Sequence, residues 1–157
     1  QKYIIELTYS TAQRFIFDGN HKKAFPAALH ALRLSTAMYG SSSVQLVPAY
    51  LLLAEACIGA GNLQQASDYL SQAQWIVLRT PDCSGAIQHR LHRGLGLLSA
   101  AEGNFEEALY HLASDIYLAS STFGLRSIEA SGGYFHMANI FFHLNKMDIA
   151  NSLYAEV

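Results

Sequence analysis

His89 and His92 are the strongest candidates for metal chemistry in this 157-residue sequence. A spacing of three residues places both imidazoles on one face of a helix, where they could share a transition-metal ion. Arg90 and Arg93 alternate with them. Two neighbouring positive charges disfavour a bound cation, so the preferred interpretation is a solvated basic face.

Other patterns that could carry catalysis are weaker. His136 and His143 lie two helical turns apart, too far for chelation without further ligands. The stretch "GLGLLS" at 94–99 hints at a dinucleotide loop, but the third glycine is missing and no strand precedes it. Cys57 has no histidine nearby in sequence and is interpreted as a core residue, and the serines at 41–43 as a capping loop rather than phosphorylation sites. The sequence therefore predicts a protein that is not an enzyme and needs no cofactor or metal.

Composition narrows the classes of partner. Apolar residues make up 51% of the chain, charged residues 14%, and the formal net charge is −2. This charge gives no reason to expect nucleic acid or a membrane surface as a partner. Two cysteines are too few for a disulfide framework and indicate a reducing compartment. No apolar stretch reaches the ~18 residues that a membrane span needs.

A period of 42 residues organises the whole chain. It is marked by predicted turns at Gly19, Gly61, Gly103 and Asn145. Glycine and asparagine tolerate the left-handed conformation that ends many helices. Small residues lie seven positions before and five positions after each turn: Ala12, Ala54, Gly96 and Ala138, then Ala24, Ala66, Ala108 and Ala150. Small contact residues allow two antiparallel helices to approach closely. We expect an all-α chain of four helical hairpins, with helices of roughly 14 to 18 residues.

The period also predicts the domain organisation. The repeats span about 1–42, 43–84, 85–126 and 127–157, the last one truncated, and together they form a single array. Ser43 and Ser127 are expected to cap the helices that follow them. An array ending at the last residue would expose an apolar edge, so we expect a fragment of a longer chain that self-associates.

Asp115 breaks the pattern of the repeats. The same position holds Ala31, Ala73 and Val157 in the other copies, and a buried unpaired carboxylate would cost several kcal/mol. One hypothesis is that Gly132 and Gly133 open space beside a buried Asp115, which then reaches a donor such as His136 or a backbone N–H. The alternative is a slightly rotated helix with Asp115 in water.

The turn, the small residue before it and the alanine after it resemble the tetratricopeptide repeat (TPR). The 42-residue length and the aromatic-Gly loops at 39–40 and 123–124 resemble the kinesin light chains and their relatives. The resemblance implies a TPR-like superhelical solenoid whose concave wall is built by the first helix of each hairpin. It places twelve tentative partner-binding residues on that wall: Tyr9, Gln13, Phe17, Leu51, Glu55, Ile58, Arg90, Arg93, Leu97, Phe135, Asn139 and Phe142. Such a mixed apolar wall suits an amphipathic helix or an extended apolar segment, unless neighbouring repeats of the same chain cover part of it.

A more specific resemblance rests on "SSSVQLVPAYLLLAEACIGAGNLQQASDYLSQAQWIVL" at 41–78, with "LHRGLGLL" and "SGGYFHMANIFF". This portion is similar to the TPRs of a motile-cilium member of the zinc-finger MYND domain-containing group. The resemblance implies a non-enzymatic scaffold of the cytoskeleton, in the axoneme of cilia and sperm flagella. Its partners would be another TPR protein and components of axonemal inner-arm dynein. The ligands of the zinc finger are absent from this sequence, so nothing about zinc is carried over.

The alternative is a cytosolic TPR adaptor for cargo or signalling complexes, and a regulatory lobe of an enzyme is a third class.

Overall fold

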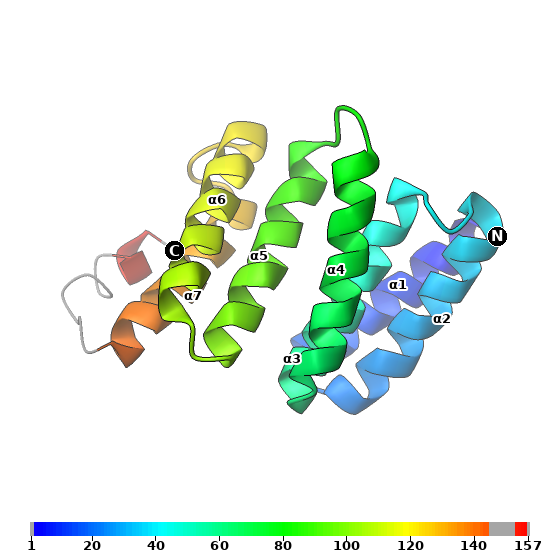
Figure 1. The fold of residues 1–157 in the computed structure, drawn as a ribbon, viewed down its shortest axis with the longest axis horizontal. Helices are drawn as coiled ribbons and strands as arrows, with labels where there is room; N and C mark the ends of the chain where they lie inside the picture. The colour runs from blue at the N-terminus through cyan, green and yellow to red at the C-terminus, as the bar shows by residue number, and fades with distance from the viewer. Residues whose placement is uncertain (1, 145–152, 157) are drawn as a thin grey trace. The chain divides into compact units, whose positions relative to one another are not determined.

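The computed structural model describes residues 2–144 and 153–156, and the regular elements among them are all helical (Figure 1). The expected all-α class is therefore confirmed. The chain divides into two compact units, 1–83 and 84–157. The division falls within one residue of the predicted boundary between the second and third repeats. Whether the repeats form one superhelical array stays a prediction.

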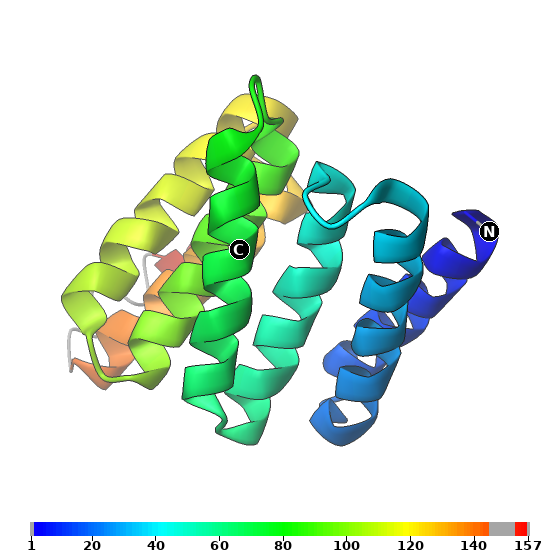
Figure 2. The same cartoon turned by 45° about the vertical axis from the view of Figure 1, so that its right-hand side comes forward.

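The first unit contains two helical hairpins (Figures 1 and 2). Its elements are α1 (Lys2–Phe17), α2 (His21–Tyr39), the short 3-10 helix η1 (Val44–Leu46), α3 (Val47–Ala60) and α4 (Leu63–Arg79). Each of these α-helices packs on the next, and α1 also contacts α3. The buried residues Ala12, Ala28, Leu52 and Leu53 form a core cluster where α1, α2 and α3 meet.

The second unit contains α5 (Gly85–Ala101), α6 (Phe105–Phe123) and α7 (Ile128–His143) (Figure 1). The antiparallel helices α5 and α6 pack along their lengths, and α7 returns to pack on α6 and to contact α5. Ala108, Leu112 and Ile140 form the buried cluster that joins α6 to α7. Within the described residues, no helix is both long and apolar enough to cross a membrane.

The predicted turns between paired helices are confirmed at three of the four positions. Gly19, Gly61 and Gly103 have φ angles of 75°, 84° and 83°, which L side chains rarely adopt. The fourth predicted turn, Asn145, lies outside the described residues, as do Ala150 and Val157. The repeat therefore ends the first helix of each described pair through the same backbone conformation.

The small residues lie where the paired helices approach most closely. Ala12, Ala24, Ala66, Ala108 and Ala138 are fully buried, and Ala54 is 1% exposed. Gly96 has the same role, because a Cβ atom there would lie 3.0 Å from Cγ of Leu112. The stretch at 94–99 therefore belongs to the interior of α5 and is not a dinucleotide loop.

One local expectation needs correction, and the two predicted N-caps are confirmed. The helices α2 and α6 have 19 residues each, longer than expected, because they continue to the aromatic residue before Gly40 and Gly124. Ser43 caps the short helix η1, which precedes α3: its Oγ accepts the N–H of Gln45, 3.1 Å away. Ser127 caps α7, accepting the N–H of Ala130 at 3.2 Å.

Candidate functional site

A groove of about 350 Å³ lies among the three helices of the second unit. Most of its wall is apolar, and three polar side chains of α7 complete it. The described lining residues are Leu97, Ala100, Ala101, Phe105, Leu112, His136, Asn139, Ile140 and His143. We call it the α5–α7 groove. A concave, mainly apolar surface with a few fixed polar groups is the usual form of a binding site.

One polar group of the groove, the imidazole of His136, has a strongly lowered pKa. Burial, the largest cause, and the nearby charge of Arg93 lower the pKa of His136 to about 4, while the charge of Asp115 acts in the opposite direction. His136 is therefore a neutral imidazole near pH 7, with one nitrogen that donates and one that accepts. Its uncharged state suits an apolar wall, because an imidazolium would lose hydration there.

The rim of the groove is fixed by ring contacts and one short hydrogen bond. The imidazole of His143 stacks on Phe105, with ring centroids 6.3 Å apart and planes 13° apart. The hydroxyl of Tyr154 donates to Oδ1 of Asn139 at 2.6 Å. The side-chain oxygen of Asn139 therefore already accepts a hydrogen bond. Its NH2 group is the part of the amide that can donate to a bound segment.

Only part of the predicted site on α7 faces this groove. Of the predicted binding residues on α5 and α7, Leu97 and Asn139 line it. Phe135 and Phe142 are 44% and 50% exposed and are not among its lining residues. The stripe that faces the groove includes His136, Ile140 and His143, so α7 is rotated by about one residue relative to the expected face.

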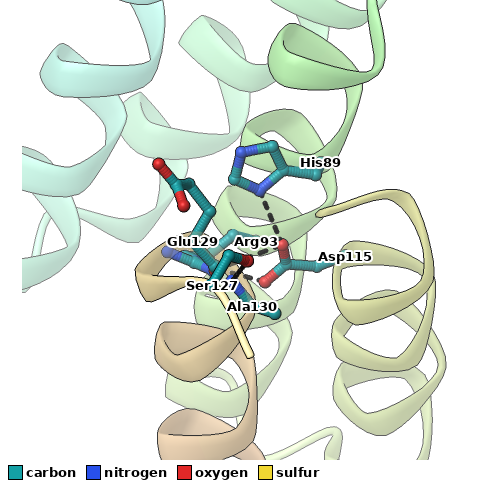
Figure 3. A network of polar contacts seen from close by, with 6 residues as sticks. All are labelled: His89, Arg93, Asp115, Ser127, Glu129 and Ala130. Atoms are coloured by element: carbon teal, nitrogen blue, oxygen red, sulfur yellow. Dashed lines mark hydrogen bonds and ion pairs between the residues drawn. The ribbon is translucent and has the colours of Figure 1, made fainter. Parts of the chain in front are cut away.

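Arg93 turns toward the interior rather than toward the groove. Its Nε donates to Oδ2 of Asp115 at 2.8 Å and its Nη2 to Oδ1 at 3.3 Å. Nη2 also donates to the backbone carbonyl of Glu129 in the first turn of α7. Nδ1 of His89 lies 2.9 Å from Oδ1 of Asp115. Figure 3 shows these residues, with α5 supplying both donors and α6 supplying the carboxylate.

The hypothesis of a buried, paired Asp115 is confirmed, but its predicted donor was wrong. Asp115 is 0% exposed, and its hydrogen-bonding side-chain partners are His89 and Arg93 instead of His136. A carboxylate only accepts, so Nδ1 of His89 carries the proton that is shared with it. The repeat position that is apolar in the other copies is thus used here for a buried ion pair.

The two glycines of α7 provide the space for this ion pair. A Cβ at Gly133 would lie 2.6 Å from Cγ1 of Ile116 and 3.0 Å from Oδ2 of Asp115. A Cβ at Gly132 would lie 2.7 Å from Nη1 of Arg93. The distances of 2.6 and 2.7 Å are too short for a real Cβ atom, so the expected role of these glycines is confirmed.

The solvated basic face expected around His89 and His92 is wrong. His89 is only 3% exposed. His92 is half-buried, and its Nδ1 faces Nδ1 of His111 at 3.2 Å, so one of the two imidazoles must donate to the other. Burial lowers the pKa of both His92 and His111. Within the described residues, no group of three side chains is arranged to hold a metal ion.

Cys57 lies in the interior of α3. It is 1% exposed in α3, and burial raises the pKa of its thiol. A buried thiol with a raised pKa is a poor nucleophile, because the thiolate is the reactive form. Cys57 is therefore a core residue, as predicted.

No protein-family model matches this chain. Solved structures match it over 97% of its length. BtubC (BKLC) from P. vanneervenii is 16% identical, with a TM-score of 0.62 over 55% of that protein. A Podosopora anserina protein with nearly identical kinesin-light-chain TPR-like repeats is 18% identical, with a TM-score of 0.55 over 72% of its length. The fold is a TPR-like helical repeat. The chain spans about half the length of BtubC.

In a TPR-like repeat the first helices of the first unit are α1 and α3, which carry six of the twelve predicted binding residues. On α1, Gln13 is exposed and Phe17 is 91% exposed, whereas Tyr9 packs half-buried against the core cluster. On α3, Leu51 is 8% exposed, and Glu55 and Ile58 are half-buried. Gln13 and Phe17 are therefore the most exposed of these six predicted binding residues.

Sequence reasoning missed several groove residues in this TPR-like unit. His136, Phe105 and Ile140 line the α5–α7 groove but were not predicted to bind. For the residues on α7, the sequence pattern that indicates the groove is the spacing of positions 136, 140 and 143 on one helix face. The exposed phenylalanines at 135 and 142 have the same kind of spacing and masked it.

Proposed function

We propose that this chain is a non-enzymatic protein–protein interaction scaffold, and that its α5–α7 groove takes an apolar segment of a partner protein. The observation that carries the proposal is the groove itself, an apolar hollow of about 350 Å³ in a TPR-like repeat. A hollow of this size accommodates one or two large apolar side chains. An amphipathic helix, whose anchors recur every three or four residues, supplies such side chains on one face.

The polar groups of the groove support a protein segment rather than a charged small molecule. The described lining residues include no Asp, Glu, Lys or Arg, and the lowered pKa of His136 keeps that imidazole neutral near pH 7. His136, Asn139 and His143 lie on the same helix and offer hydrogen bonds at one side of an otherwise apolar wall. This arrangement gives an amphipathic helix a place for its apolar face and for one polar edge.

Site-specific crosslinking tests this proposal. A photoreactive amino acid is placed at Ala101, an exposed groove residue, and in a matched chain at Ala37, an exposed residue of α2. We expect a discrete crosslinked partner only from position 101, and the crosslinked peptide should carry apolar residues at helical spacing. Equal products from both positions, or a crosslinked segment without apolar anchors, would contradict the proposal.

We further propose that the scaffold belongs to the axoneme of motile cilia and sperm flagella, together with another TPR protein and inner-arm dynein. The support is the resemblance of residues 41–78 to a motile-cilium protein of the zinc-finger MYND domain-containing group. The tagged protein in ciliated cells should resist detergent extraction and be released from the axonemal fraction by high salt. The Ala101→Arg variant should be released more readily, and Ala37→Arg should behave as the unaltered protein.

A cytosolic adaptor for cargo or signalling complexes is the alternative. It is favoured by the likeness to a protein described by its kinesin-light-chain repeats. In that case the tagged protein should be soluble in detergent, and that result would remove the axonemal proposal while leaving the scaffold proposal intact.

A further inference from the structure

A second hollow, of about 410 Å³, lies between α5 and α6 in the second unit. Two exposed tyrosines of α6 mark its outer edge: Tyr110 is 66% exposed and Tyr117 is 71% exposed. Its described lining residues are His92, Tyr110, Ala113, Ser114, Tyr117 and Leu118. We call this surface the tyrosine groove. It shares no lining residue with the α5–α7 groove.

The spacing of the two tyrosines matches the repeat of one particular peptide conformation. Residues seven apart lie on one face of a helix, about 10.5 Å apart along its axis. A polyproline II helix rises about 9.3 Å in each three-residue turn, so successive turns meet successive tyrosines. The residues between the tyrosines on this face, Ala113 and Ser114, are small. A rod-like segment can therefore lie over these small residues and contact both tyrosine rings.

The Tyr110 end of the tyrosine groove is held in place by contacts within the protein. The ring of Tyr110 meets the imidazole of His111 edge-on, with centroids 5.3 Å apart. His111 is held in turn by His92, through the 3.2 Å contact between their Nδ1 atoms. The hydroxyl hydrogen of Ser114 is already used within the helix, because its Oγ donates to the backbone carbonyl of Tyr110 at 3.2 Å. Rigid aromatic groups lose little conformational freedom on binding, which favours affinity.

Charge distinguishes the two ends of the tyrosine groove. Glu106 and Glu107 lie in the first turn of α6, one turn before Tyr110. The side chain of Glu107 is 55% exposed, with its carboxylate 3.8 Å from Nε2 of His111. None of the lining residues near Tyr117 is charged. A ligand with one basic end is therefore favoured in a single orientation.

We propose that the tyrosine groove binds a proline-rich segment of a partner protein in the polyproline II conformation, with a Lys or Arg at the Tyr110 end. Such segments dock in aromatic-lined grooves, and their backbone carbonyls have no internal partners, so the tyrosine hydroxyls can donate to them. An amphipathic helix fits less well, because the surface between the two tyrosines is formed by small residues and has no pockets for large apolar side chains. The tyrosine groove and the α5–α7 groove share no lining residue, so a ligand can bind to one of them without the other.

Fluorescence anisotropy with defined peptides tests the proposal. The probe is a labelled ten-residue polyproline peptide that carries two arginines at one end, and its partner carries two glutamates instead. We expect saturable binding of the arginine peptide and at least about fivefold weaker binding of the glutamate peptide, since its charge opposes Glu106 and Glu107. Raising the salt concentration should reduce this difference, because the charges are exposed.

Variants then locate the site. Tyr110→Ala and Tyr117→Ala should each weaken binding by at least about fivefold, as expected for truncated interface aromatics. The double variant Glu106→Gln, Glu107→Gln should remove the preference for the arginine peptide. Tyr3→Ala is the matched control, because Tyr3 is 74% exposed on α1 of the other unit, and it should leave binding unchanged.

All of these positions are exposed on helices, and circular dichroism confirms that each variant keeps its helix content. Unsaturated binding of both peptides, or unchanged affinity in both tyrosine variants, would overturn the proposal. Equal affinity for an arginine peptide of the same length without prolines would show that charge alone binds and would overturn it as well.

Discussion

Arg93 on α5 and Asp115 on α6 form a two-point ion pair in the interior of the second unit, with N–O distances of 2.8 and 3.3 Å. The carboxylate is fully buried, whereas the arginine side chain keeps 23% of its exposure. Since Arg93 also donates to the carbonyl of Glu129, this pair links all three described helices of the unit (Figure 3). Its removal should therefore affect stability more than the loss of a surface ion pair.

Asp115→Ala should lower the free energy of unfolding by about 2–4 kcal/mol, because it leaves Arg93 and His89 without their acceptor. Asp115→Asn should cost less, since an amide oxygen still accepts one hydrogen bond. Urea denaturation followed by circular dichroism measures both. The matched control is Asp68→Ala on the exposed face of α4, which should change stability by at most about 0.5 kcal/mol. A neutral or stabilising Asp115→Ala would contradict a structural role for the pair.

Gly133→Ala should destabilise the protein even though alanine favours a helix by roughly 1 kcal/mol over glycine. The added Cβ would lie 2.6 Å from Cγ1 of Ile116, so α6 and α7 would have to separate. We expect a net loss of about 1–3 kcal/mol in chemical denaturation, typical of overpacking. Ser121→Ala on the exposed face of α6 is the matched control: it raises helix propensity and removes only the exposed hydrogen bond from its Oγ to the carbonyl of Tyr117, so it should be close to neutral. A stabilised Gly133→Ala protein would show that the space is not needed.

Stability should fall when the pH decreases from about 6.5 to 4, in part because of His136. The pKa of His136 in the folded protein is lowered to about 4, so in this range the unfolded chain takes up a proton and the folded chain does not. Between pH 7.5 and pH 5 this single group should cost about 2 kcal/mol of unfolding free energy. The lowered pKa values of His92 and His111 act in the same direction.

His136→Gln isolates that contribution, because glutamine does not titrate. The variant should lose about half or more of the difference in stability between pH 7.5 and pH 5. His30→Gln, at an exposed position of α2, is the matched control for the substitution itself. An identical pH dependence in His136→Gln and the unaltered protein would show that His136 is accessible to protons in the folded state.

Ser127→Ala should cost about 1 kcal/mol, the usual effect of removing an N-cap. Its Oγ accepts the N–H of Ala130 in the first turn of α7, the turn that also presents the Glu129 carbonyl to Arg93. Ser127→Gly should cost only a few tenths of a kcal/mol. Ser43→Ala should cost less than Ser127→Ala, because Ser43 caps only the short η1. Thermal or urea denaturation that ranks Ser43→Ala as the more damaging variant would contradict this assignment.

The 42-residue period was sufficient to predict the turns at Gly19, Gly61 and Gly103 and the buried small residues around them. These features are local properties of residue type: glycine tolerates a positive φ, and only a small side chain lets two helices approach closely. The same reasoning showed that Asp115 is unusual, because its copies in the repeat are apolar. In each case one position and its periodic equivalents contain the information.

Tertiary structure alone decided which side chains meet. Asp115 pairs with His89 and Arg93, which lie 26 and 22 residues earlier on another helix, and the contact depends on the packing of α5 against α6. The rotation of α7 likewise decides that His136 and Ile140, rather than Phe135 and Phe142, face the α5–α7 groove. A rotation of about one residue changes no local pattern in the sequence, because positions 135 and 136 both recur at helical spacing. Packing energy selects between them, and that energy depends on atoms from three helices at once.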